Sequence, residues 1–264
     1  MQMLSIVPIP AFTDNYIWLI TNSAYSSKRA FVVDPGDADP VIKHLEAHQL
    51  TLAGILLTHH HPDHVGGVEK LLEYAGLGVS VIGPYNEKIQ YMSRSVKEDD
   101  RLEVLGVGFS VLEVPGHTLD HIAFYTDEPS EPALFCGDTL FVAGCGRIFE
   151  GTAAQMHESL SKLARLPGNT TFYCAHEYTL SNLRFAQAVE PESKELESYI
   201  EECEALRRQN SPTVPSTIAK ELTINPFLRS DQTRVKAAAE SRSGVMLNSP
   251  AEVFRVTREW KDNF

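Results

Sequence analysis

Residues 58–64 read T-H-H-H-P-D-H, a combination of imidazoles and a carboxylate that suits a transition-metal site. On an extended chain, positions i and i+2 point to the same side, so His59 and His61 are expected to converge on one ion. Asp63 and His64 then face elsewhere and are expected to serve a second ion. Histidine runs are also found without any metal, so the prediction of a metal site depends on the elements that flank the loop.

The segments around this loop predict a strand before it and a helix after it. Residues 54–57 form a short apolar run that is typical of a buried strand. Residues 64–75 include two glycines and then place apolar side chains at helical spacing. A loop between a strand and a helix is a usual place for the functional groups of an α/β enzyme.

Three other predicted strands also end in candidate ligands, namely His117, Asp138 and His176. Each would be weak evidence alone, because polar residues after strands are common. Together with the first loop they give five histidines and two aspartates, which are His59, His61, Asp63, His64, His117, Asp138 and His176. Seven ligands exceed the needs of one tetrahedral zinc, whereas two ions that share one carboxylate use the whole set. Nitrogen and oxygen donors without thiolate suit zinc, iron or manganese, and the residue types leave that choice open.

The 264 residues are enough for one large domain or two unequal ones, and their net charge is −12. An acidic chain is not expected to bind nucleic acid or an acidic membrane, which need a basic surface. No apolar stretch is long enough for a membrane span, and the N-terminus lacks the basic start of a signal peptide. The four cysteines form no C-x-x-C pair, which favours reduced thiols and a cytoplasmic location.

Short β-rich runs alternate with helical stretches up to residue 174, which predicts an α/β core over residues 1–174. The predicted strands are 4–9, 16–21, 30–33, 54–57, 79–82, 108–114, 122–126, 133–136 and 171–174, and the predicted helices are 41–49, 64–75 and 152–166. Residues 175–264 contain helical patterns at 180–189, 193–209 and 251–261, which predicts a second, helical domain.

The order T-H-x-H-x-D-H, G-H-T, G-D-T and a late histidine resembles the metallo-β-lactamase superfamily. The resemblance implies an αββα sandwich with its metals at one edge of the sheets. It assigns His59, His61 and His117 to the first metal and Asp63, His64 and His176 to the second, with Asp138 bridging both.

Two residues keep alternative interpretations at this stage. Asp34, before Pro-Gly, resembles the buried supporting aspartate of the superfamily, but a plain turn aspartate is equally compatible with its sequence context. His121, four residues after His117, is the nearest rival as a metal ligand, and we rank it behind His117.

A narrower resemblance, to the glyoxalase II (hydroxyacylglutathione hydrolase) family, covers most of the chain. It lies in residues 9–16, 137–152, 175–186, 225–229 and 258–262. It implies a thioester hydrolase with two divalent ions, most simply zinc, and a helical substrate-binding domain. We expect a monomer that acts on a small molecule. The implied reaction converts S-D-lactoylglutathione to glutathione and D-lactate, the second step of methylglyoxal detoxification. Asp63 and Asp138 would be catalytic, orienting a metal-bridging hydroxide.

The same resemblance places Arg147, Phe149, Tyr178, Arg258 and Lys261 around the glutathione moiety. Glutathione carries a net negative charge, so an enzyme of charge −12 needs local cations to bind it. Arg258 and Lys261 are three positions apart and therefore lie on one helical face. Without the resemblance, a solvated helix end would explain these two cations equally well. Some family members have Tyr where this chain has Phe149, which puts one hydrogen bond to the ligand in doubt.

Other functions on a similar scaffold remain alternatives. A lactonase or an iron-dependent persulfide dioxygenase would use the same loops, although the dioxygenase needs one iron and lacks such a helical tail. A diiron redox protein would carry Glu in place of His61 and an added flavin domain. A non-catalytic scaffold would have no physical reason to keep seven ligands. Cys145 is not expected to be a nucleophile, since a free Cys is usually inert.

Overall fold

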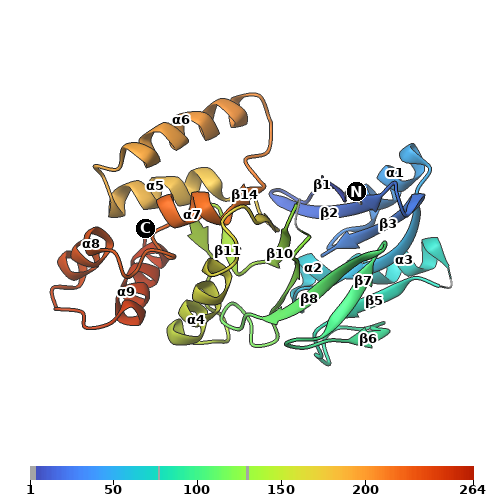
Figure 1. Ribbon diagram of the computed structural model, residues 1–264, viewed down its shortest axis with the longest axis horizontal. Coiled ribbons are helices and arrows are strands. Elements are labelled where there is room, and N and C mark those ends of the chain that lie inside the picture. The colour runs from blue at the N-terminus through green and yellow to red at the C-terminus, as the bar shows by residue number, and fades with distance from the viewer. Residues whose placement is uncertain (1–3, 77, 129–130) are drawn as a thin grey trace. The chain divides into compact units, whose positions relative to one another are not determined.

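The computed structural model describes residues 4–76, 78–128 and 131–264. The chain forms two compact units, of which the first comprises Met1–Glu113 and Asp120–Gly137 and the second comprises Val114–Leu119 and Asp138–Phe264. Each unit is described by itself, and Figure 1 identifies the elements. No helix among the described residues is long and apolar enough to cross a membrane.

The first unit contains a mixed sheet in the order β1-β2-β3-β4-β5-β6. Its strands are β1 (Ser5–Ala11), β2 (Asn15–Asn22), β3 (Ser26–Val33), β4 (Thr51–Leu56), β5 (Ser80–Gly83) and β6 (Arg94–Ser95). The connections β1-β2 and β2-β3 are antiparallel, and β3 to β6 run parallel. Five of these strands were predicted, and the two-residue β6 is too short to leave a sequence pattern.

Helices α1 (Ala38–His48) and α3 (Val68–Ala75) cover one face of this sheet (Figure 1). Val41 and Leu45 of α1 and Leu71 of α3 are fully buried in a cluster with β-strand residues such as Ile17 and Ile55. At the start of α1, Asp37 caps the helix by accepting a hydrogen bond from the Asp39 amide.

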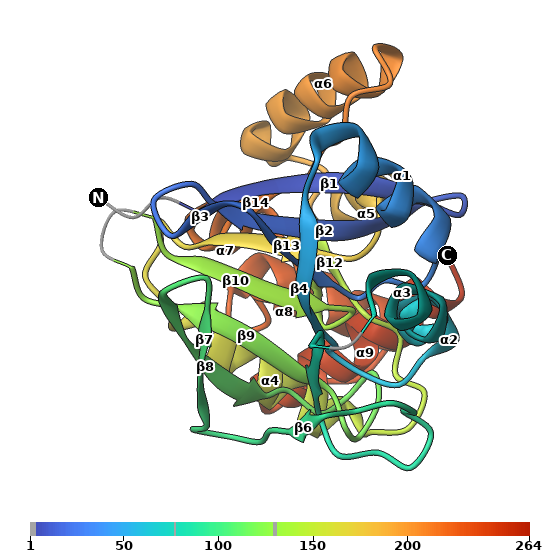
Figure 2. The ribbon, with the colours of Figure 1, turned by 90° about the vertical axis from the view of Figure 1, so that its right-hand side faces the viewer.

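An antiparallel set of strands completes the first unit (Figure 2). It consists of β7 (Arg101–Val104), β8 (Val107–Glu113), β9 (Ile122–Thr126) and β10 (Ala133–Gly137), paired in that order. Inward-facing aromatic residues such as Phe109, Phe124 and Phe135 are fully buried. The prediction of alternating β-rich runs is confirmed, although β7 was missed.

The helix predicted over 64–75 is wrong as a single element. The structure has a short α2 (Pro62–Val65), then Gly66 and Gly67, then α3. A Cβ at Gly66 would lie 2.8 Å from the Gly36 oxygen, and one at Gly67 would lie 2.5 Å from the Pro35 oxygen. The helix is interrupted because the Gly67 amide donates a 2.9 Å hydrogen bond to the Pro35 carbonyl oxygen of the turn after β3 and not to a carbonyl of α2, and this close approach leaves no room for a side chain.

The second unit is mostly helical. Its helices are α4 (Ala153–Ala164), α5 (Thr179–Val189), α6 (Lys194–Arg208), α7 (Ile218–Ile224), α8 (Thr233–Ser243) and α9 (Pro250–Asp262). Its strands are the hairpin β11 (Leu140–Phe141) and β12 (Gly144–Cys145) and the pair β13 (Thr171–Cys174) and β14 (Ser216–Thr217). The predicted helices α4, α5, α6 and α9 are confirmed, whereas α7, α8 and the two-residue strands were not predicted.

Local sequence explains where these helices begin, and aromatic packing explains how they hold together. Thr152 and Gln155 form a reciprocal capping box at α4, and Ser249 caps α9 just before Pro250. The ring of Phe227 packs against Phe185 and Phe254 with centroid distances of 5.8 Å to each.

Candidate metal centre

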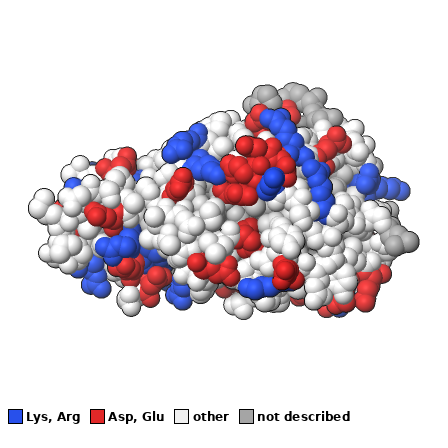
Figure 3. All heavy atoms as spheres, turned by 90° about the horizontal axis from the view of Figure 1, so that it is seen from below, with Lys and Arg blue, Asp and Glu red and all other residues white. Residues whose placement is uncertain are grey.

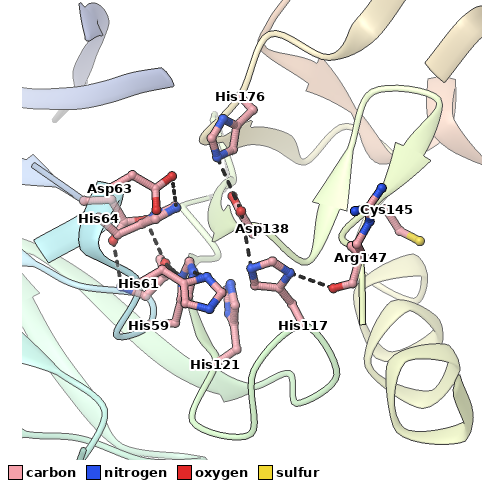
Figure 4. Close-up of polar contacts among 12 residues, drawn as sticks. His59, His61, Asp63, His64, His117, His121, Asp138, Cys145, Arg147 and His176 are labelled. Atoms are coloured by element: carbon pink, nitrogen blue, oxygen red, sulfur yellow. Dashed lines mark hydrogen bonds and ion pairs between the residues drawn. The ribbon is translucent and has the colours of Figure 1, made fainter. Parts of the chain in front are cut away.

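The loop after β4 brings the first two predicted ligands together. Nε2 of His59 lies 3.1 Å from Nδ1 of His61, with the His59 side chain fully buried (Figure 4). The extended chain between β4 and α2 produces this arrangement, as the i, i+2 spacing predicted.

Asp63 and His64 form a second pair at the start of α2. Their Oδ2 and Nε2 atoms lie 3.5 Å apart, and the amide of Asn15 on β2 donates a 3.1 Å hydrogen bond to the same carboxylate. The rings of His59 and His64 lie 4.1 Å apart between centroids, so this second pair lies directly beside the first, and its service to a second ion stays a prediction. The helix starting at Pro62 turns the chain back and keeps His64 beside His59.

The buried carboxylate of Asp34 contacts two residues of this loop. It is 3% exposed, and its two carboxylate oxygens accept hydrogen bonds of 2.7 Å from the amide and the hydroxyl of Thr58. Oδ2 also lies 3.0 Å from Nδ1 of His64. A carboxylate on the far nitrogen of a histidine fixes its ring and leaves Nε2 for a metal. The structure therefore favours the supporting role over that of a plain turn residue.

The second unit gathers the other three predicted ligands around one carboxylate. Oδ2 of Asp138 lies 3.4 Å from Nε2 of His117 and 3.4 Å from Nε2 of His176 (Figure 4). Nδ1 of His117 lies 2.7 Å from the Arg147 carbonyl oxygen and must donate its proton there, so Nε2 carries the lone pair. All three side chains are nearly buried.

The spacing of the polar atoms tests whether these residues suit metal ions. Two ligands at about 2.0–2.1 Å from a tetrahedral ion are about 3.3 Å apart. The ligand pairs within each unit are 3.1 to 3.5 Å apart. Neutral imidazoles and carboxylates at such distances are a donor set for divalent ions, and seven of them support two ions.

The remaining histidines of these loops have other partners. His60 turns away from its neighbours, with Nδ1 2.9 Å from Asp120 and Nε2 2.9 Å from Lys88 Nζ. It is buried, and these two partners take up both of its ring nitrogens. His121 stacks on His59 at a centroid distance of 4.5 Å, and its Nδ1 lies 3.0 Å from the Ile122 carbonyl oxygen.

The residues predicted to bind substrate lie in the second unit, and two of them pack on the predicted ligands His117 and His176. Phe149 meets His117 edge-on at 5.3 Å, and Tyr178 stacks flat on His176 at 4.6 Å. Arg147 and Phe149 are well exposed, whereas the Arg258 side chain is 7% exposed and donates a 3.0 Å hydrogen bond to the Cys145 carbonyl oxygen.

Lys261 is held by Ser181, whose carbonyl oxygen lies 3.2 Å from Nζ. Burial, with smaller effects of Arg258 and Arg184, lowers the pKa of Lys261 to about 8. Cations that repel one another in a partly buried place favour an anionic ligand. Burial raises the pKa of the Cys145 thiol to about 11, which agrees with the expectation that this residue is no nucleophile.

A buried carboxylate that the sequence did not reveal anchors the β11–β12 hairpin between Asp138 and Arg147. Glu221 on α7 is fully buried and accepts hydrogen bonds from the Ala143 amide (2.7 Å), Ser216 Oγ (2.8 Å) and Asn225 Nδ2 (3.0 Å). Asn225 also donates to the Phe141 and Gly144 carbonyl oxygens, and Asn182 donates to that of Val142. Both asparagines lie in segments that carried the family resemblance, but a single acid on a short helix gave no signal.

Glu221 makes stability depend on pH. Burial raises the pKa of its carboxyl to about 7, so the folded state holds this proton at pH values where the unfolded chain has lost it. That contribution is complete below the unfolded pKa of about 4.5 and is lost as the pH rises through about 7. Glu221→Gln keeps a hydrogen-bond acceptor and the contact to Ser216, but it has no proton to lose. We therefore expect the difference in unfolding free energy, variant minus wild type, to rise by about 1–3 kcal/mol when the pH is raised from 5 to 8. Thermal melts across this range measure it, and a difference independent of pH would contradict it.

Comparison with known proteins agrees with these observations. The metallo-beta-lactamase superfamily model matches residues 12–176, and the model of the hydroxyacylglutathione hydrolase C-terminus matches residues 177–264. Among solved structures, ETHE1 from Myxococcus xanthus is similar with a TM-score of 0.65 at 23% identity, covering 98% of this chain and 91% of that one. TTHA1623, solved in a di-iron-bound form, has a TM-score of 0.58 at 23% identity and covers 84% of this chain and 99% of that one. These likenesses show the metallo-β-lactamase fold.

Curated relatives are much closer in sequence. A hydroxyacylglutathione hydrolase of Pseudomonas aeruginosa PAO1 is 55% identical over 99% of this chain and 100% of its own length. That of Pseudomonas putida KT2440 is 52% identical over 99% of this chain and 100% of its own length. The chain therefore belongs to the hydroxyacylglutathione hydrolase family of metallo-β-lactamase enzymes, with a metallo-β-lactamase fold followed by the C-terminal helical domain of that family.

Proposed function

We propose that this enzyme hydrolyses the thioester of S-D-lactoylglutathione, and of other S-2-hydroxyacylglutathiones, to glutathione and a 2-hydroxy acid. The observation that carries the proposal is the contact between the two kinds of site residue in the second unit. Phe149 and Tyr178, which the resemblance assigns to glutathione, pack directly on His117 and His176, which it assigns to the metals. A glutathione thioester held by these aromatic rings would present its carbonyl carbon to the ligands.

The proposed ligand set would hold two zinc ions. His59, His61 and His117 would hold the first, and Asp63, His64 and His176 the second, with Asp138 shared. The distances near 3.3 Å inside each unit support this assignment. Zinc is the simplest choice for histidine-rich sets without thiolate, while iron and manganese suit the same donors.

When bound, such ions supply Lewis-acid polarisation and a water acidic enough to act as a nucleophile near neutral pH. Asp63 and Asp138 orient the attacking oxygen, and Asn15 and Asp34 keep Asp63 and His64 in place. Attack on the thioester carbonyl breaks the C–S bond, and water adds its OH to the acyl group. The leaving thiolate has a conjugate acid with a pKa of about 8.5, so no residue need act as a strong general acid.

Arg147, Arg258 and Lys261 would provide the positive charge that an anionic substrate needs on an acidic protein. Figure 3 shows acidic and basic side chains interspersed on one face of the molecule. An anionic ligand is therefore attracted only where several cations lie close together. Phe149 contributes ring contact without a hydroxyl, so this part of the ligand would be held by packing alone.

The domain division, the location and the state of assembly are also proposals. We assign catalysis to residues 1–174 and substrate binding to residues 175–264, a division close to the bounds of the two matching family models. Four free cysteines, all buried, support a reducing cytoplasm. We propose a monomer that acts on a small molecule and binds neither nucleic acid nor membrane, in keeping with its charge of −12.

Hydrolysis by the purified, zinc-loaded protein tests the function. We expect rapid loss of thioester absorbance with S-D-lactoylglutathione, and a kcat/KM at least about 100-fold lower with the lactoyl thioester of N-acetylcysteamine, which carries no carboxylate for the cations to bind. Equal rates on both thioesters would contradict the glutathione site. Absence of thioester turnover by protein with verified metal, together with cleavage of a lactone or oxidation of a persulfide, would overturn the proposed reaction.

A further inference from the structure

A carboxylate at the end of α9 forms ion pairs with two of the three cations that we assign to substrate binding. Oδ1 of Asp262 lies 2.9 Å from Nη2 of Arg258 and 3.5 Å from Nε of Arg147. One oxygen therefore lies between a guanidinium from the last helix and one from the loop that follows the β11–β12 hairpin.

The position of Asp262 is unfavourable for the helix itself. It is the last residue of α9, where the helix dipole favours cations and disfavours carboxylates. Its ion pairs with Arg147 and Arg258 offset that cost. Together with Lys261, the three cations carry more charge than Asp262 can neutralise, so an anion would still be attracted.

The two arginines differ in how firmly they are held. The Arg258 side chain is 7% exposed, lies 5.1 Å from the centre of the Phe227 ring, and keeps its bond to the Cys145 carbonyl oxygen. The Arg147 side chain is 61% exposed and meets Asp262 at the longer distance. An incoming carboxylate would therefore replace Asp262 at Arg147 first, while Arg258 stays in place.

We propose that Asp262 is an internal competitor of the substrate carboxylate, which sets how tightly this site binds a glutathione thioester and its product. The inference rests on the proposed function, since it concerns the same site. In the free enzyme Asp262 holds Arg147 and Arg258 together, which limits their repulsion. Binding exchanges one carboxylate for another, and the return of Asp262 helps the product glutathione to leave.

Asp262→Asn is the direct test, because it keeps the volume and removes the charge. We expect KM for S-D-lactoylglutathione and the inhibition constant of added glutathione both to fall by about threefold to tenfold, the range of a partly exposed ion pair. Both constants should also rise more steeply with salt than in wild type, because the site gains one net positive charge. Asp262→Ser serves as a second neutral variant if the first does not fold.

Glu259→Gln is the matched control, since Glu259 lies on the same helix and pairs with Arg255 at the surface, 2.8 Å away. It removes the same charge and should leave both constants and their salt dependence unchanged. An unchanged or higher KM in Asp262→Asn, or an equal effect of Glu259→Gln, would overturn the inference while wild-type turnover still upholds the proposed function. A wild type that neither turns over the thioester nor binds glutathione would overturn both.

Discussion

Asp138→Asn is expected to lower kcat/KM for the thioester by at least about 1,000-fold and to reduce the bound metal below the two equivalents per chain that we propose. One oxygen of Asp138 lies 3.4 Å from the Nε2 atoms of both His117 and His176, so it is placed to be shared by these two proposed ligands. A neutral amide binds divalent ions far more weakly, and loss of a Lewis acid removes several kcal/mol of transition-state stabilisation. Metal analysis after dialysis and steady-state kinetics measure the two effects.

Asp120→Asn provides a matched control for that substitution. Asp120 also has a nearly buried carboxylate close to an imidazole, with Oδ1 2.9 Å from His60 Nδ1, but neither residue is among the proposed ligands. We expect this variant to retain the metal content of the wild type. Equal loss of metal in the two variants would mean that packing of the loops, and not coordination by Asp138, decides metal binding.

The double variant Arg258→Ala/Lys261→Ala is expected to raise KM for S-D-lactoylglutathione by about 100-fold and to change kcat by less than about threefold. Each cation can donate a charge-assisted hydrogen bond worth about 1.5–3 kcal/mol to a carboxylate far from the reacting carbonyl. An interaction that is equally strong in the ground state and the transition state alters KM alone. Initial rates over a wide substrate range separate the two constants.

Arg255→Ala/Lys236→Ala is the control for net charge. Both residues form exposed i, i+4 pairs, with Glu259 and Glu240, so their removal also subtracts two positive charges from the helical region. KM should stay within about twofold of wild type, since surface pairs of this kind contribute little. A similar rise of KM in both double variants would attribute the effect to long-range attraction and would remove Arg258 and Lys261 from the binding site.

The single variant Arg258→Ala removes a structural contact as well as a positive charge. Its bond to the Cys145 carbonyl oxygen helps to fix the hairpin before Arg147. Comparison with Lys261→Ala, whose contacts are to Ser181, shows how much of the change in KM comes from the hairpin.

The local pattern of the sequence determined the candidate metal-binding loops and most of the elements that carry them. His59 and His61 converge because alternate residues of an extended chain point the same way. His117, Asp138 and His176 were identifiable because each follows a short apolar run. The helices after residue 175 with clear periodicity and caps, such as α6 and α9, were also predictable.

Contacts between distant parts of the chain decided the rest. Asp34 supports His64, Asn15 holds Asp63, and Glu221 anchors Ala143, in each case across 30 or more positions of sequence. The break at Gly66 and Gly67 likewise depends on a backbone that passes close by.

Helices α7 and α8 and the two-residue strands were missed because they have too little periodicity of their own. Residue type and local spacing determine which groups are available for chemistry, since they need only a few neighbouring positions. Which carboxylate meets which histidine or arginine, including Asp262 with Arg147, depends on side chains that only folding brings within hydrogen-bond distance.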